Sequence, residues 1–276
     1  MLVHKFIRRK FFTMGAWMCC ALAPLSAGNN GGYFSIGFQY SNMGAGGSAN
    51  SVFSSKGLDS ATTDATSGNL FGGDVQLGYK QFFGKKKRFG MRYYAMFSAQ
   101  GGAYSYPQDY NVTLNSDGSV GTISYTLTNG ALTNLFYGAG WDVLIDFFQS
   151  DTRSFGIFGG IMLGGTSWFL GEGNNSCATV NYNVSADKNG VACTSTKTSY
   201  EQRAKKLGKQ ASYSPNYVQF AFNFGVRGNI SKHNGFEIGV RAPVITTPYF
   251  VDKSQSIGSL EFRRLIVFFA NYVVNF

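Results

Sequence analysis

The sequence has few of the residues on which enzymes and soluble proteins usually rely. Charged residues make up only 14% of the 276 residues, whereas soluble proteins average about a quarter. Histidine occurs only at His4 and His233. A nucleophile–histidine pair is therefore hard to build, and a histidine metal site has no second ligand. We expect no enzymatic activity, no metal and no cofactor.

Long apolar runs are also scarce. No internal stretch approaches the about 18 consecutive apolar residues that suggest a membrane-spanning helix. Four of the 24 Lys and Arg residues lie in the first 27 positions, which leaves 20 basic against 14 acidic residues in the remainder. These basic residues are scattered and accompany no nucleic-acid motif, so we expect no nucleic-acid partner.

The first 27 residues resemble a secretory signal peptide. Four basic residues lie between Lys5 and Lys10, and an apolar region too short to span a membrane follows. Small residues then allow cleavage after Ala27. We therefore expect an exported mature chain of residues 28–276.

Only two cysteines lie beyond this segment, Cys177 and Cys193. Exported proteins fold in an oxidising compartment, so we expect these two cysteines to form one disulfide. It would close a loop of about seventeen residues and contribute roughly 3 kcal/mol to the order of that loop.

What the chain has instead is glycine, aromatic residues and alternation. Aromatic residues make up 16% of the sequence, and its 36 glycines disfavour long helices. The last seventeen residues read LEFRRLIVFFANYVVNF. Counting back in twos from Phe276, every residue to Ile266 is apolar, while the other parity is mixed, as in a strand with lipid on one side. The same count places Arg264 on the lipid side and Arg263 inside.

Seven earlier segments alternate in a similar way, and the connections between the eight segments alternate in length. Short periplasmic turns and longer extracellular loops are typical of outer-membrane barrels. The sequence therefore predicts an all-β fold, a transmembrane antiparallel β-barrel of eight strands within residues 28–276. One alternative stays open, because residues 122–128 look extended and would add strands if they entered the membrane. The other seven strands are expected near residues 32–40, 70–82, 89–98, 132–148, 155–168, 217–227 and 236–242, and the long extracellular loops at about 43–69, 101–130, 169–215 and 246–258.

Several of these strands and turns resemble the Helicobacter outer-membrane protein family, which includes the Hop porins and adhesins and their Hor relatives. The stretches that carry the resemblance are GYKQFFGKKKRFGMRYY (78–94), SFGIFGGIMLGGTSW (154–168), FNFGVRGNISKHNGFEIGVRAPV (222–244) and the terminal strand. They are most similar to the small Hop-type porins. The resemblance implies an outer-membrane barrel surrounded by lipid and lipopolysaccharide, and it permits either a pore or an adhesin. The ending Tyr272, Val274 and Phe276 resembles the signal read by the barrel-assembly machinery.

Inward-facing charges are the candidate functional residues. Two interpretations compete: a water-filled lumen that passes small solutes, or ion pairs that fill a narrow barrel, since eight strands leave room for little more than side chains. Inward glycines, which leave volume open, and the family resemblance favour a small porin-like channel. The alternative is a closed barrel that displays its loops for adhesion, for example to a host surface receptor. The lumen-lining candidates are Asp74, Lys80, Arg92, Asp142, Asp146, Arg227, Glu237, Arg241 and Arg263.

Overall fold

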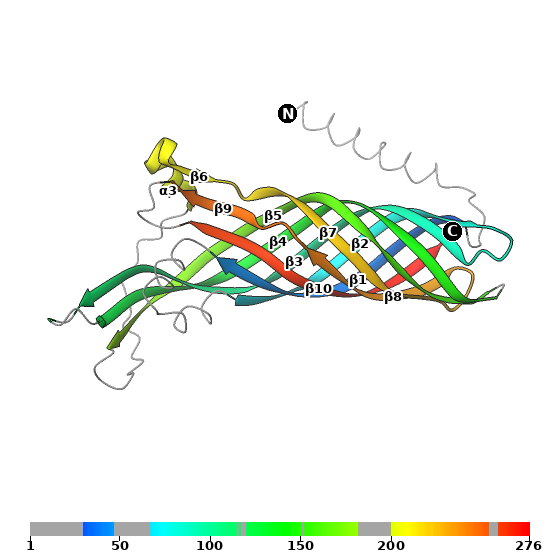
Figure 1. Ribbon diagram of the computed structural model, residues 1–276, viewed down its shortest axis with the longest axis horizontal. Coiled ribbons are helices and arrows are strands. Elements are labelled where there is room, and N and C mark those ends of the chain that lie inside the picture. The colour runs from blue at the N-terminus through cyan, green and yellow to red at the C-terminus, as the bar shows by residue number, and fades with distance from the viewer. Residues whose placement is uncertain are drawn as a thin grey trace, which may run out of the picture.

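The computed structural model describes residues 30–46, 67–114, 116, 120–150, 152–181, 200–253 and 259–276, so the predicted signal peptide at 1–27 lies outside the described residues. The described chain forms a closed antiparallel β-barrel (Figure 1). Among these residues, no helix is both long and apolar enough to cross a membrane. The strands are β1 (Gly31–Gly46), β2 (Ser67–Phe83), β3 (Phe89–Leu114), β4 (Val120–Gln149), β5 (Ser154–Asn181), β6 (Ala211–Tyr213), β7 (Asn216–Asn229), β8 (Asn234–Pro243), β9 (Thr247–Asp252) and β10 (Leu260–Asn275). A short α-helix, α3 (Tyr200–Leu207), and a 3-10 turn, η2 (Gly208–Gln210), precede β6.

Two of the barrel's strands are interrupted. Residues 267–274 of β10 pair with β8, whereas Leu260 and Phe262 of β10 pair with β9. β9 therefore continues the strand that β8 begins. In the same way β6 pairs with β9 and continues β7. Pairing of β1 with β10 closes the sheet. The predicted eight-stranded antiparallel barrel is therefore confirmed.

The gap between β8 and β9 is bridged by a side chain. Gln219 on β7 donates from Nε2 to the carbonyl of Ile245 at 3.0 Å, and its Oε1 accepts from the Ile245 amide at 3.1 Å. The Gln219 amide thus supplies the donor and acceptor that a neighbouring backbone would provide.

The two ends of the barrel differ. One end, the turn end, holds the short connections at residues 84–88, 150–153 and 230–233 together with Phe276, and the opposite end is here called the loop end. At the loop end β3, β4 and β5 run past the barrel (Figure 1). The last pairing of β2 with β3 joins Leu70 to Gly102, but β3 stays paired with β4 as far as Leu114.

The strands are therefore longer than alternation predicted. Most of the expected loop 101–130 is β3 and β4, and residues 122–128 belong to β4 rather than to additional strands. Within the expected loop 169–215, β5 continues to Asn181, and α3 follows after a gap in the described chain. The expected loop 246–258 contains β9. Backbone pairing between β4 and β5 continues up to Thr122 and Asn181. Residues 103–114, 120–131 and 172–181 thus form a three-stranded extension beyond the barrel.

Apolar side chains cover the outside of the barrel. Ile36, Phe38, Leu163, Ile238 and Tyr272 are each half exposed or more, on four different strands. Their neighbours in sequence point inward and are mostly buried. Period-two alternation thus places an apolar surface outside, where lipid solvates it, and a mixed interior.

Candidate functional site

The barrel interior contains eight of the nine charged residues expected to line it. Each of the eight retains at most 4% of its exposure, although they carry full charges in a narrow barrel. Their inward orientation follows from strand alternation, which turns successive side chains to opposite faces of the sheet. These residues are Asp74, Lys80, Arg92, Asp142, Asp146, Arg227, Glu237 and Arg241.

Arg263 is the exception, and its predicted inward orientation is wrong. Its side chain is exposed, whereas Arg264, which was expected to face lipid, is buried with 5% exposure. The cause is a β-bulge: Ser41 pairs with Val267 but Met43 pairs with Arg264, so Leu265 and Ile266 together oppose one residue of β1. Both bulge residues are exposed, and the alternation reverses beyond them.

Arg92 forms the centre of the buried charge network. Its Nε lies 2.7 Å from Asp142 on the adjacent β4, and its Nη1 lies 2.5 Å from Glu237 on β8. Asn223 donates to the Asp142 carboxylate at 3.1 Å and to the Tyr94 hydroxyl at 3.0 Å. The network therefore joins β3, β4, β7 and β8 through the interior.

Two further ion pairs also connect strands that are not neighbours. Arg227 on β7 binds Asp146 on β4 at 2.7 Å, and Arg241 on β8 binds Asp74 on β2 at 2.9 Å. Both pairs span part of the interior, because β5 separates β7 from β4 while β10 and β1 separate β8 from β2. Lys80 has no carboxylate within ion-pair distance among the described residues.

Lys80 instead donates to the Asn275 side chain at 2.9 Å. Its ammonium also lies 4.4 Å from the ring centroid of Tyr33. An amide oxygen and an aromatic face thus stand in for a counter-ion. This places a buried cation close to the turn end, where β10 finishes.

Apolar side chains fill the space between these charges. One buried cluster comprises Phe82, Leu144, Phe158 and Phe269, and a second includes Tyr33, Tyr94, Met96, Phe136 and Met162. The Arg92 guanidinium lies 4.4 Å from the Phe158 ring centroid, and that of Arg241 lies 3.9 Å from Phe269. The interior is thus a packed mixture of ion pairs and aromatic rings.

Inward glycines were expected to leave volume open, and the structure contradicts this. A Cβ added at Gly140 would collide with the ring of Tyr94, and one at Gly156 or Gly160 would collide with the carboxylates of Asp146 or Asp142. Gly138 and Gly164 face one another, and a Cβ on either would meet the other's Cα at 2.7 Å. Neighbouring side chains and backbone occupy the space that these glycines provide.

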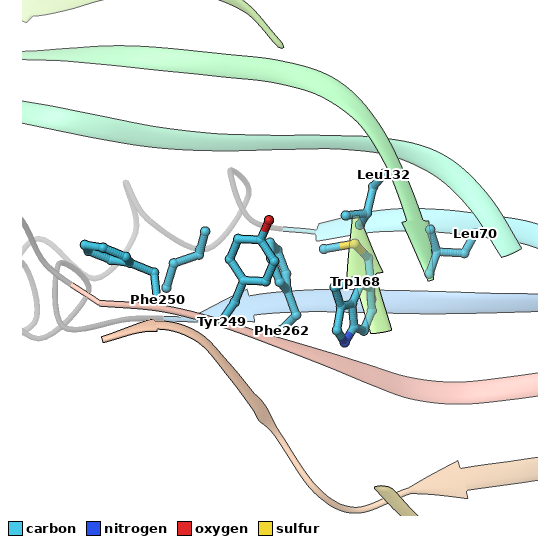
Figure 2. Close-up of a cluster of buried hydrophobic side chains, with 8 residues drawn as sticks. Leu70, Leu132, Trp168, Tyr249, Phe250 and Phe262 are labelled. Carbon is cyan, nitrogen blue, oxygen red and sulfur yellow. The ribbon is translucent and has the colours of Figure 1, made fainter. Parts of the chain in front are cut away.

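A third buried apolar cluster lies at the loop end and is here called the mouth cluster. Its members come from β1, β2, β4, β5, β9 and β10, and Figure 2 shows their side chains gathered between these strands. Phe262 stacks on Trp168 with ring centroids 5.2 Å apart and meets Tyr249 edge-on at 5.1 Å. Ala204 and Leu207 of α3 pack against the cluster. The mouth cluster consists of Met43, Leu70, Leu132, Trp168, Tyr249, Phe250, Leu260 and Phe262.

Several interior residues were not among the sequence candidates. Tyr33, Tyr94, Asn223 and Gln39 contact the buried charges, and Arg264 is itself a further buried charge. The first four have inward parity in their strands, so alternation combined with side-chain polarity would have identified them. The inward orientation of Arg264 could be predicted only from the bulge, and the run of apolar residues in β10 does not reveal where a bulge lies.

The remaining site predictions concern the cysteines and the carboxy-terminus. The predicted Cys177–Cys193 disulfide lies outside the described side chains. Tyr272 and Phe276 point outward at the turn end, Val274 is half-buried, and the Phe276 amide donates to the Gly32 carbonyl at 2.9 Å. Among the described residues, no group of three His, Cys, Asp or Glu side chains is placed to hold a metal ion.

The chain is similar to several solved structures of outer-membrane proteins. The Neisserial surface protein A structure covers 88% of this chain and 97% of its own, with 10% identity and a TM-score of 0.34. OprG from Pseudomonas aeruginosa covers 91% and 98%, with 12% identity and a TM-score of 0.35. Ail of Yersinia pestis, solved in complex with the heparin analogue sucrose octasulfate, covers 88% and 98%, with 11% identity and a TM-score of 0.29. Likeness at this level carries no information on function.

Sequence comparison is more specific. Comparison with curated proteins gives no significant match. The family model described as Helicobacter outer membrane protein matches residues 74–276, from the middle of β2 to the last residue. This range includes all the buried ion pairs and most of the barrel. The chain belongs to the Helicobacter outer membrane protein family, and it is an outer-membrane β-barrel.

Proposed function

We propose that this protein is a closed outer-membrane barrel whose loop end, facing the cell exterior, mediates surface interaction. A small solute channel, which the family resemblance favoured at the level of sequence, is the competing function. The observation that carries our choice is the packing of the barrel interior, where ion pairs and aromatic rings connect opposite walls.

A solute that moved along this barrel would meet two obstacles. The first is the Arg92 network, in which one guanidinium holds carboxylates on β4 and β8. The second is the mouth cluster, where the Phe262 ring contacts those of Trp168 and Tyr249. Opening a path would break buried ion pairs, which costs about 3–5 kcal/mol for each unpaired partner, and would expose apolar rings to water.

The three-stranded extension supports a role in display. Outer-membrane barrels have short periplasmic turns and longer extracellular loops, so the loop end is assigned to the cell exterior. The extension is paired backbone over residues 103–114, 120–131 and 172–181. Paired strands hold a defined shape away from the membrane, which suits recognition of a macromolecular partner such as a host surface receptor or matrix protein.

Conductance distinguishes the two functions directly. Purified, folded mature protein is inserted into planar bilayers, and a closed barrel gives no discrete current steps over repeated insertions. A variant that carries Trp168→Ala, Tyr249→Ala and Phe262→Ala tests the mouth cluster, with Phe268→Ala on the outward face as its control. Regular steps from the unaltered protein would overturn the closed-barrel proposal.

A deletion tests the display function. Residues 106–128 are replaced with Asn-Gly, a sequence suited to a two-residue hairpin turn. We expect a folded barrel in the outer membrane and loss of binding to host cells or matrix. The matched control replaces residues 48–65, which connect β1 to β2 in the sequence and are not part of the extension. Retained binding by the first variant would remove the extension from the proposal.

A further inference from the structure

The half of the barrel interior nearer the loop end, here called the loop half, carries an unbalanced positive charge. Among the described residues, five cationic side chains are buried (Lys80, Arg92, Arg227, Arg241 and Arg264) but only four anionic ones (Asp74, Asp142, Asp146 and Glu237). Arg92, Arg227 and Arg241 use all four carboxylates. Lys80 lies towards the turn end, beside Asn275. The uncompensated charge of the loop half therefore belongs to Arg264.

Arg264 is held without a carboxylate. Its Nη1 donates to Gln100 Oε1 at 3.2 Å, and its guanidinium carbon lies 5.8 Å from the Phe136 ring centroid. A neutral amide and a distant ring do not replace the hydration of a guanidinium, and an unpaired buried charge costs several kcal/mol. Arg264 Nε has no hydrogen-bond acceptor. This arrangement calls for a negative group that the chain itself does not supply among its described residues.

A small cavity lies at the required position. It has a volume of about 10 Å³, and Arg264, Arg241, Gln39, Phe136 and Met162 are among the residues that line it. Such a volume holds roughly one water-sized species. Met43 of the mouth cluster pairs with Arg264 in the sheet, so the cavity lies just inside that cluster.

Unused hydrogen-bond donors are concentrated around this cavity. Nε and Nη2 of Arg241, Nε of Arg264 and Nε2 of Gln100 are all buried without an acceptor. The Gln39 and Asn271 side-chain oxygens are unpaired acceptors in the same region, but both amides donate to Asp74. This part of the interior therefore has four unused donors and a surplus positive charge against two unused acceptors.

We propose that the cavity between Arg241 and Arg264 binds a single monovalent anion of about the size of chloride. A neutral water would satisfy donors but leave the charge of Arg264 uncompensated, whereas an anion does both. Polyatomic anions such as sulfate or phosphate do not fit the volume. The site is independent of the proposed surface interaction, because it concerns the folded interior and predicts a dependence of folding on anions.

The test is urea unfolding of the mature chain in detergent micelles, with chloride exchanged for gluconate at constant ionic strength. A single bound anion lowers the unfolding equilibrium constant about tenfold for each tenfold rise in chloride above the dissociation constant. The Arg264→Met variant should lose this dependence. Arg263→Met, which removes the adjacent exposed arginine, should retain it.

Direct detection covers the case in which Arg264→Met fails to fold. Crystals of the unaltered protein grown in bromide should show one anomalous peak between Arg241 and Arg264. Absence of that peak overturns the proposal, as does a chloride dependence that is equal in the unaltered protein and Arg264→Met. An equal response to gluconate and chloride would also overturn it, because it would reflect ionic strength alone.

Discussion

Arg92 on β3 reaches across the full width of the barrel to Glu237 on β8, with Nη1 2.5 Å from Oε1. In the eight-stranded order, β8 is four strands from β3 in either direction. The two residues thus lie on diametrically opposite walls. A single ion pair spans the interior because the barrel is narrow enough for one arginine side chain to cross it.

Removal of Arg92 should be among the most costly changes in the barrel. Arg92→Met leaves the buried carboxylates of Asp142 and Glu237 without their cation, so we expect a loss of about 3–5 kcal/mol in unfolding free energy. Urea titration of the refolded protein measures it. Lys205→Met is the control, because the Lys205–Glu201 pair is exposed and should contribute less than about 1 kcal/mol. Equal effects of the two changes would contradict a structural role for the Arg92 network.

The Gln219 bridge gives a second prediction. Gln219→Ala leaves the amide and carbonyl of Ile245 without partners beside the gap between β8 and β9. We expect destabilisation of about 1–3 kcal/mol and faster amide hydrogen exchange at Ile245. Gln81→Ala, at an exposed position on β2, should change neither quantity. Unchanged exchange at Ile245 in Gln219→Ala would show that the bridge does not protect the gap.

Gly140 tests whether the inward glycines face free space. Gly140→Ala would force a methyl group into the ring of Tyr94, so we expect a loss of about 1–3 kcal/mol from overpacking. Addition of Tyr94→Ala should recover part of this loss. Gly44→Ala is the matched control, since a Cβ there meets nothing within 4 Å. A neutral Gly140→Ala would instead support open volume in the lumen.

The carboxy-terminus gives a prediction about assembly. Deletion of Phe276 removes an outward-facing aromatic ring and the hydrogen bond from its amide to Gly32. We expect less folded protein in the outer membrane, measured as the heat-modifiable fraction in membrane extracts. Phe276→Tyr keeps an aromatic end and should assemble normally. Normal assembly of the truncated chain would remove Phe276 from the assembly signal.

Alternation in the sequence, together with the lengths of the connections, was sufficient to predict the barrel, its strand number and the inward orientation of eight charged residues. It predicts which side of a strand a residue such as Asp142 occupies, but not which partner it meets, because Glu237 approaches Arg92 from a strand far away in sequence. The expectation that Gly140 leaves open volume in the lumen was wrong for the same reason, because the Tyr94 ring that fills this space belongs to another strand. The length of β3 was missed because polar residues beyond Gly102 obscure the pattern once a strand leaves the membrane.

The bulge at Leu265 and Ile266 shows how one residue can set the phase of a strand. On one side of it the sequence alternates to place Phe276 against lipid, and on the other side it alternates to place Arg264 inside. Loss of one of these two residues would remove the bulge and leave a regular strand in which Phe262 still points inward and Arg263 outward. Comparison of related sequences must therefore allow a one-residue offset at this point, since an alignment without it would match lipid-facing positions with interior ones.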